Sequence, residues 1–404
     1  MRDQLQAGMA KATRLTREGR LEEATAVIQR TLGGRFGPEA SSGASDEPIE
    51  TARRTVNEAV RTAATSQPDP TRHGLRRAPR PPRRFRGMPR PFGPPTTPAV
   101  VSAGGQFIER SYTNRAGTRA YKLYIPGGYV GQEVSLVIML HGCTQNPDDL
   151  AAGTRMNALA EEHTFLVAYP AQAVADNNSK CWNWFEGANQ QRGRGEPSLI
   201  AGITCEILGE YHVAVGRVYV AGMSAGGAMA AIMGTAYPDL YAAVGVHSGL
   251  APGAAHDLSS AFAAMRQGGP VTARRYAPNV ATAGEFSQVV PVIVFHGDLD
   301  TTVHPSNADH LLAHYTADGG DDTGKPVPPV RVQQGQVPGG YAYTRAIHHD
   351  SGGRAIAERW TVHGLAHAWS GGSRPGSYTD PRGPDASAEI VRFFRQHQQQ
   401  EPMV

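Results

Sequence analysis

The stretch RVYVAGMSAGGAMAAIMG, residues 217–234, decides the fold class of this chain of 404 residues. Its first part, residues 217–220, contains valine and tyrosine, which favour an extended strand. Its second part, residues 225–233, consists of small and apolar residues that suit a helix. We therefore expect Ser224 to lie at a strand-to-helix turn.

Two glycines flank this serine at the positions where a sharp turn leaves no room for side chains. Gly222 lies two residues before Ser224 and Gly226 lies two residues after it, which gives the pattern G-x-S-x-G of a nucleophile elbow. Such a turn directs the serine hydroxyl, the amide of Ala225 and the helix N-terminus toward one point. The alternative is a serine that only caps the helix. The presence or absence of a histidine and a carboxylate as partners distinguishes the two interpretations.

A nucleophilic serine needs a histidine to take its proton and a carboxylate to hold that histidine. In folds that contain a nucleophile elbow, the acid follows a later strand. The stretch PVIVFHGDLDTTVHP, residues 291–305, contains a buried strand at 291–295, followed by a turn with two aspartates. We predict that Asp300 is the acid, with Asp298 as the fallback, although most aspartates in such loops are turn residues or helix caps.

Composition cannot select the base, because the chain has 15 histidines. Position selects it: RWTVHGLAHAWSGG, residues 359–372, contains the end of an apolar strand at 357–362 and then a loop with His363 and His367. His367 precedes a flexible glycine-containing segment that would let its ring reach the elbow, so we predict that it is the base. His363 lies at the end of the strand and is interpreted as structural.

An oxyanion hole needs a second backbone amide near the serine, usually from the loop after an early strand. The stretch LVIMLHGCTQNPDDL, residues 136–150, has a continuous apolar strand at 136–140 that then turns away through His141 and Gly142. We predict that the amides of Cys143 and Ala225 line the hole. The thiol of Cys143 is interpreted as a buried free cysteine without chemistry of its own.

Together these segments resemble the polyhydroxybutyrate depolymerase family of esterases, which have the α/β-hydrolase fold. The resemblance rests on LHGCTQN, CWNWF, AGMSAGGAMA, HGDLDTTV and HAWSGG, and covers roughly residues 107–395. It implies that Ser224, Asp300 and His367 are catalytic, and that Cys143 and Ala225 form the oxyanion hole.

The expected fold is a mostly parallel sheet flanked by helices in a catalytic domain at residues 101–404, with a possible small cap at 248–288. Strands are expected at 107–114, 120–125, 136–140, 165–169, 217–222, 242–247, 292–296 and 357–362. Helices are expected at 149–162, 199–212, 225–237, 305–316 and 384–399.

The first hundred residues differ in composition from the rest. Residues 1–35 have apolar positions at helical spacing and predict a short amphipathic helical segment. Residues 36–100 predict a disordered linker rich in arginine and proline, with eight arginines between positions 71 and 98. Removing these from the formal net charge of +3 leaves −5 on the rest of the chain. A solvated spacer is favoured over a strip that binds a polymer granule surface, and nucleic acid is not an expected partner.

Compartment and cysteine pairing remain open. The sequence shows neither a run long enough to span a membrane nor an apolar signal-like start, which favours the cytoplasm; export stays possible because similar family members are exported. Three cysteines argue against a disulfide scaffold, although Cys181 and Cys205 could pair.

The aromatic residues near the expected site give weaker signals about the substrate. Trp182, Trp184 and Phe185 lie together in a turn-rich segment, and Trp369 follows the expected base by two residues. They could form a platform for an acyl chain, with Trp369 the best candidate, although buried aromatics are more often core.

The expected chemistry is ester hydrolysis through an acyl-enzyme, without metal or organic cofactor. The expected substrates are poly(3-hydroxybutyrate) or short hydroxyalkanoate oligomers. Two alternatives remain: a carbohydrate esterase of the acetyl xylan or feruloyl type, and a granule- or nucleic-acid-binding protein that acts through its N-terminal extension.

Overall fold

The computed structural model describes residues 104–268, 290–316 and 328–398. The chain divides into two units, residues 1–87 and 88–404, and all of these residues belong to the second unit. The helical segment expected at 1–35 and the linker expected at 36–100 lie outside the described residues, as does part of the cap expected at 248–288.

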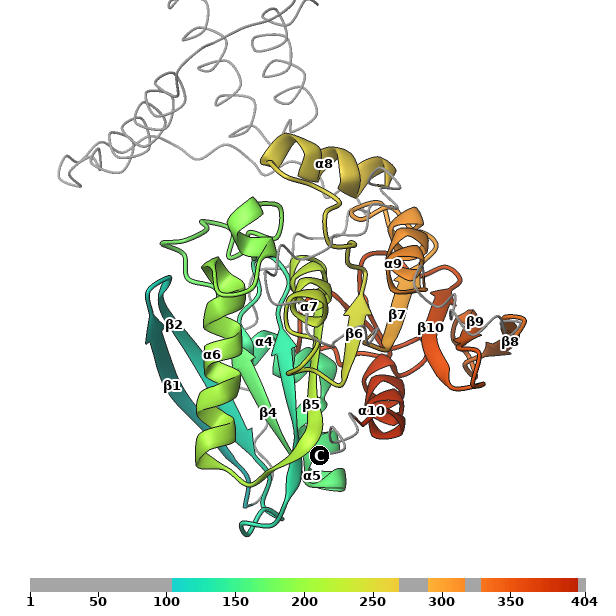
Figure 1. The fold of residues 1–404 in the computed structure, drawn as a ribbon. Helices are drawn as coiled ribbons and strands as arrows, with labels where there is room; N and C mark the ends of the chain where they lie inside the picture. Colours follow the sequence, from blue (N-terminus) through green and yellow to red (C-terminus); the bar gives the residue numbers. More distant parts are fainter. Residues whose placement is uncertain (1–103, 269–289, 317–327, 399–404) are drawn as a thin grey trace, which may run out of the picture. The chain divides into compact units, whose positions relative to one another are not determined.

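A ten-stranded sheet in the order β1-β2-β4-β3-β5-β6-β7-β10-β9-β8 forms the centre of the described part of the chain (Figure 1). Neighbouring strands from β4 to β10 in this order are parallel, whereas β1, β2, β9 and β8 pair in antiparallel fashion. The strand bounds are β1 Gln106–Asn114, β2 Gly117–Ile125, β3 Val134–Leu140, β4 Phe165–Pro170, β5 Val213–Met223, β6 Ala243–His247, β7 Val292–Gly297, β8 Arg331–Gln336, β9 Ala342–His349 and β10 Ala355–Val362. A separate pair of short parallel strands is formed by β11 Trp369–Ser370 and β12 Thr379–Asp380.

The parallel strands are apolar on both faces because helices cover both. Along β3, Leu136, Ile138 and Leu140 belong to one core cluster, whereas Val137 and Met139 belong to the other, as the alternation of side chains along a strand requires. The first cluster includes residues of α6, α7 and α9, and the second includes residues of α4, α5 and α10. The helix bounds are α4 Pro147–Thr154, α5 Met156–His163, α6 Gly195–Glu210, α7 Ala225–Ala236, α8 Leu258–Gln267, α9 Ser306–Thr316 and α10 Ala386–Gln396, with a 3₁₀ turn η1 at Gly187–Gln190.

The mostly parallel sheet between two layers of helices confirms the expected fold class, and each of the eight expected strands is present. One expected helix is wrong in detail: residues 149–162 form most of α4 and most of α5 rather than one helix. The break falls at Arg155, whose φ of 56° ends one helix and starts the next, and whose guanidinium donates to Asp385. The carbonyls of Gly153 and Thr154, which a continuous helix would use, accept instead from Ser373 and Ser387 of the C-terminal segment.

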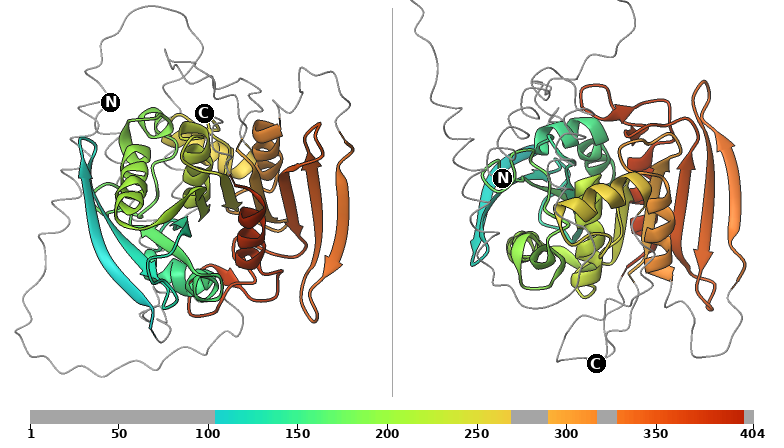
Figure 2. Two further views of the ribbon diagram at one scale, coloured as in Figure 1. Left: turned by 60° about the horizontal axis from the view of Figure 1, so that its bottom comes forward. Right: turned by 90° about the horizontal axis from the view of Figure 1, so that it is seen from above.

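The sequence did not predict the hairpin β8–β9 or the helix α8. The hairpin extends the sheet beyond β10, at the edge opposite β1 (Figure 2). The sequence of β8, RVQQGQ, lacks the apolar alternation of a half-buried strand, because this edge strand is held mainly by backbone pairing with β9. Helix α8 lies within the segment that was expected to be irregular; a capping box between Asp257 and Ser260 starts it.

Among the helices of the described ranges, none has the length and apolar content needed to cross a membrane.

Candidate active site

Ser224 occupies a strained turn between β5 and α7. Its φ of 56° and ψ of −120° lie where residues other than glycine are rarely found. The Ser224 amide donates to the carbonyl of His247 at 2.9 Å, and the Ser224 carbonyl accepts from Ala228 at 2.9 Å. The turn is thus fixed to β6 on one side and to the helix on the other. The serine is 8% exposed.

The two glycines of the elbow are required by close contact between backbone segments. A Cβ at Gly226 would overlap the carbonyl oxygens of Leu140 and His141, and one at Gly222 would overlap the carbonyl oxygen of Gly226. The pattern G-x-S-x-G therefore reflects steric limits on both sides of Ser224.

His367 and Asp300 are brought together from the loops that follow β10 and β7. Nδ1 of His367 lies 2.7 Å from Oδ2 of Asp300, whose side chain is fully buried. The other oxygen, Oδ1, accepts the amides of Thr302 and Val303 at 2.9 Å each. Because an ionised carboxylate only accepts, Nδ1 of His367 carries the proton and Nε2 remains the basic nitrogen.

The electrostatics of Asp300 favour the ionised form. Burial acts to raise the pKa of Asp300, but hydrogen bonds with His296 and His367 outweigh it, and the pKa lies well below its usual value. Nε2 of His296 is 3.4 Å from Asp300 Oδ2 and 2.8 Å from the carbonyl of Val303. The buried carboxylate is therefore surrounded by donors that stabilise its charge.

A second His–Asp pair lies in the same two loops. Nδ1 of His363 is 2.9 Å from Oδ2 of Asp298, and the amide of Gly364 donates to Oδ1 at 2.7 Å. Nε2 of His363 is 2.9 Å from Oγ1 of Thr344 on β9. The side chains of His363 and Asp298 are 43% and 38% exposed, against 10% and 0% for His367 and Asp300. This exposed pair links two loops, as the structural interpretation of His363 implies.

The loop after β3 lies against the serine and contains an unpaired amide. A Cβ at Gly142 would lie 3.5 Å from Cβ of Ser224. The amide of Gly142 donates to Oε1 of Gln145 at 2.9 Å, and that of Thr144 donates to the carbonyl of Ser179 at 2.6 Å. Among the described residues the amide of Cys143 between them has no acceptor. The amide of Ala225 is the first of α7 and has no partner within the helix.

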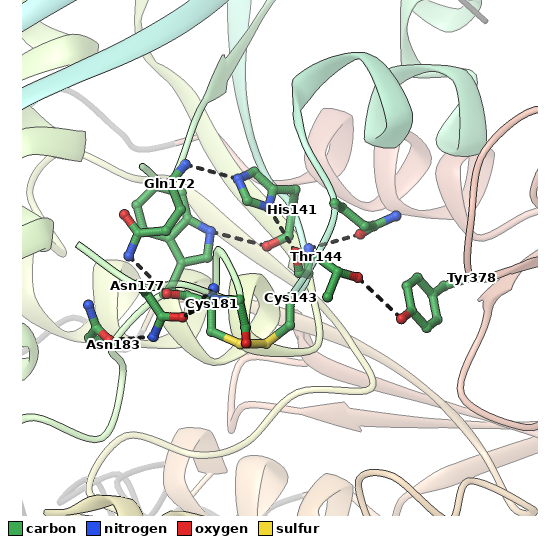
Figure 3. Close-up of a disulfide and its surroundings, with 12 residues drawn as sticks. His141, Cys143, Thr144, Gln172, Asn177, Cys181, Asn183 and Tyr378 are labelled. Carbon is green, nitrogen blue, oxygen red and sulfur yellow. Dashed lines mark hydrogen bonds between the residues drawn. A yellow bond between two sulfur atoms is a disulfide. The ribbon is translucent and has the colours of Figure 1, made fainter. Parts of the chain in front are cut away.

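The pairing of the cysteines answers one open question and corrects one expectation. Cys143 forms a disulfide with Cys181, 38 residues further along the chain (Figure 3). Cys205 is free and exposed. Cys181 therefore does not pair with Cys205, which the sequence had left open, and the expectation that Cys143 is a free thiol is wrong. The loops after β3 and β4 lie close together because these strands are neighbours in the sheet, and that order was the signal needed to find the bond.

Two buried neutral histidines contact the loops around the candidate site. Nε2 of His141 accepts the amide of Gln172 at 3.0 Å and Nδ1 is 2.8 Å from the carbonyl of Gly142; burial lowers the pKa of His141 to about 4 (Figure 3). Nε2 of His247 accepts the amide of Ser370 at 2.9 Å, and burial lowers the pKa of His247 to about 3. His247 thus contacts both the elbow, through its carbonyl, and the loop of His367, through its ring. Sequence reasoning missed both of these histidines.

The tryptophans expected at an acyl platform lie in the core. Trp369 is 1% exposed, stacks on His247 with ring centroids 4.9 Å apart, and donates to Oγ of Ser387 at 3.0 Å. Trp182 is fully buried and donates to the carbonyl of His141 at 3.1 Å, and Trp184 is buried in the same core cluster. The expectation of an exposed platform is corrected, because these rings are covered by protein.

A mostly parallel sheet with an elbow serine after β5, an acid after β7 and a histidine after β10 defines an α/β-hydrolase fold. The acetyl xylan esterase from Aspergillus awamori has a similar fold, with a TM-score of 0.55 and 19% identity over 72% of this chain and 99% of that one. The family model described as esterase PHB depolymerase matches residues 119–324, and the chain belongs to this family.

Two named relatives match part of this chain. Poly(3-hydroxyalkanoate) depolymerase C of Paucimonas lemoignei is 30% identical over 258 residues, which are 63% of this chain and 59% of that protein. Acetylxylan esterase A of Talaromyces purpureogenus is 26% identical over 226 residues, which are 54% of this chain and 58% of that protein. The chain thus spans less than two thirds of the length of either relative.

Proposed function

We propose that this protein is a serine esterase that hydrolyses ester bonds of poly(3-hydroxybutyrate) or of related short hydroxyalkanoate oligomers. The observation that carries the proposal is the 2.7 Å hydrogen bond between His367 and the buried Asp300, in a chain whose Ser224 has the strained conformation of a nucleophile elbow. Family membership and the name of the depolymerase relative support the substrate class.

In the first half of the reaction, Nε2 of His367 takes the proton of Ser224 as Oγ attacks the ester carbonyl. Asp300 stabilises the resulting imidazolium. The amides of Cys143 and Ala225 donate to the tetrahedral oxyanion, and collapse of the intermediate breaks the bond to the alcohol, which leaves with the proton from His367. Water then attacks the acyl-enzyme by the same route, releasing the acid and restoring Ser224.

A carbohydrate esterase is the second candidate, because relatives and a solved structure with this fold are named acetylxylan esterases. The two candidates share the proposed triad and differ in the substrate. Initial rates on hydroxybutyrate oligomers, acetylated xylan and methyl ferulate separate them. Faster turnover of acetylated xylan or of methyl ferulate would replace the polyester proposal.

The arginine-rich residues 71–98 are proposed as a solvated spacer rather than as a granule- or nucleic-acid-binding segment. Retention of the full chain on amorphous polymer and on DNA, compared with a variant in which the eight arginines are glutamine, tests this. A large drop in retention would favour the binding function.

The disulfide bears on the compartment in which the protein works. Disulfides persist in oxidising compartments and are rare in the cytosol. The bond between Cys143 and Cys181 therefore favours an exported enzyme over the cytoplasmic one that the sequence suggested.

The test of the esterase proposal is product release by purified wild type beside Ser224→Ala, from amorphous poly(3-hydroxybutyrate) and from the methyl ester of 3-hydroxybutyrate. We expect soluble hydroxybutyrate from the wild type alone, with the variant reduced by about 10³-fold or more. Equal turnover by a folded Ser224→Ala protein would refute the assignment of the nucleophile.

A further inference from the structure

Tyr378 is an exposed aromatic residue in a strained backbone conformation near the proposed site. Its φ is 52° and it is 45% exposed. A bulky residue with positive φ is an outlier, since glycine or asparagine takes this conformation at lower cost. If this position had only to form the turn, a residue without a ring, such as glycine or asparagine, would do so at lower cost.

The segment around Tyr378 is held firmly enough to impose this conformation. Before it, the amide of Ser377 donates to Asp149 at 2.7 Å, and Nε2 of Gln145 donates to the Ser377 carbonyl at 3.2 Å. After it, Oγ1 of Thr379 donates to the carbonyls of Ser373 and Gly376. The carbonyl of Tyr378 itself accepts the amide of Trp369 at 2.6 Å. The strain is thus maintained by contacts on both sides of the residue.

The ring of Tyr378 lies between the two loops that would do the chemistry. It meets the ring of His367 edge to face, with centroids 6.4 Å apart. Its hydroxyl is 3.2 Å from Oγ1 of Thr144, in the loop with the free amide of Cys143 (Figure 3). Thr144 is also exposed and also has a positive φ, of 67°. Two strained, exposed residues therefore contact each other beside the proposed base.

We propose that Tyr378, together with Thr144, forms the subsite for the alcohol portion of the ester and favours substrates whose alcohol portion is extended and carries a hydrogen-bond acceptor. This inference rests on the proposed function. The base must lie against the departing oxygen in order to protonate it, so a side chain beside the His367 ring borders the alcohol portion of the substrate.

The chemistry of the two side chains fits a hydroxyalkanoate oligomer. In such an oligomer the leaving alcohol is itself a hydroxy acid, with a carbonyl that a phenol or threonine hydroxyl can donate to. The Tyr378 ring adds an apolar face for the short alkyl part of that unit. In a methyl ester with the same acyl group, the alcohol portion leaves as methanol and can use neither feature.

The test compares two substrates with the same acyl group: the linear dimer of 3-hydroxybutyrate and the methyl ester of 3-hydroxybutyrate. The full-length protein is made as wild type, Tyr378→Asn and Tyr378→Phe. Asparagine tolerates the positive φ without a ring, and phenylalanine keeps the ring without the hydroxyl. We expect kcat/KM for the dimer to fall by about 10- to 100-fold in Tyr378→Asn and by about 3- to 10-fold in Tyr378→Phe. For the methyl ester we expect less than about threefold change in either variant.

If Tyr378 had only a structural role, its variants would lower kcat/KM for both substrates by the same factor. If it lay outside the site, kcat/KM would change for neither substrate. Either result would refute the proposed subsite. Phenylalanine preserves the shape of the residue, so its variant keeps the test available should the asparagine variant fold poorly. Failure of the esterase proposal has a different signature: wild-type turnover of the methyl ester would then not depend on Ser224. Serine-dependent turnover with an unchanged ratio between the substrates refutes the Tyr378 subsite alone.

Discussion

The two His–Asp pairs of the same loops allow one substitution to be tested against a matched control. In Asp300→Asn, the amide oxygen is expected to take the place of Oδ1, which accepts the amides of Thr302 and Val303. The NH₂ group then faces Nδ1 of His367, where the carboxylate oxygen lies 2.7 Å away in the wild type. His367 must turn an acceptor toward this donor, so its proton moves to Nε2, the atom that should receive the proton of Ser224.

The magnitude follows from two losses. A carboxylate and an imidazolium whose charges are about 4 Å apart attract each other by about 4 kcal/mol at an effective dielectric constant of about 20. The wrong tautomer adds a further cost, which brings the expected loss in kcat to about 10³- to 10⁴-fold. Because asparagine has the shape of aspartate and keeps the two amide contacts, the protein should still fold.

The assay is steady-state hydrolysis of the methyl ester of 3-hydroxybutyrate by wild type, Asp300→Asn and Asp298→Asn, with circular dichroism as a check on folding. Asp298 pairs with the exposed His363, so its variant should keep kcat within about threefold of the wild type. Activity of Asp300→Asn within tenfold of the wild type, or an equal loss in both variants, would refute the assignment of the acid.

Two further predictions concern the disulfide and the dependence of stability on pH. Cys181→Ser should lower the free energy of unfolding by about 4 kcal/mol, from the chain-entropy cost of a loop of 38 residues. The exposed Cys205→Ser should change it by less than about 0.5 kcal/mol. Denaturant titration measures both, and three reactive thiols in the purified wild type would contradict the bond. His141 and His247 have native pKa values of about 4 and about 3, below the ordinary value of about 6.5, so the unfolded chain binds more protons between these limits. The free energy of unfolding should therefore fall as the pH drops from about 6.5 to 4, by up to about 1.4 kcal/mol per pH unit for each histidine. A free energy of unfolding that stays constant across this range in denaturant titrations would contradict the burial of the two histidines as neutral rings.

The parts of the fold that the sequence predicted are those with a local physical signal. The parallel strands are short apolar runs, and the elbow is confined to five residues whose glycines have no room for a Cβ. The order of serine, acid and histidine along the chain could likewise be matched to the ends of predicted strands, and the choice of Asp300 and His367 over Asp298 and His363 agrees with the buried pair of the structure. Their catalytic roles stay predictions.

The parts that the sequence did not predict depend on contacts between distant segments. The disulfide partner of Cys143 follows from the neighbouring positions of β3 and β4, which no local pattern reveals. Trp369 is aromatic and follows His367 by two residues, as a pocket residue could. Only its stacking on His247 identifies it as part of the core. Tyr378 carried no signal, because its importance lies in a backbone conformation that its neighbours impose.

The fixation of the loop after β3 by the segment before α10 has a consequence for the timing of folding. Gln145 contacts Ser377 across 232 residues of chain. Ribosomes deliver the N-terminal part first, and contacts of such sequence separation form late because a long loop must close before they can be made. A nascent chain that already contains Ser224 therefore still lacks the segment that holds the loop after β3. On the proposed function, the site is complete only after the chain up to residue 377 has been synthesised, so a shorter nascent chain would not act on esters.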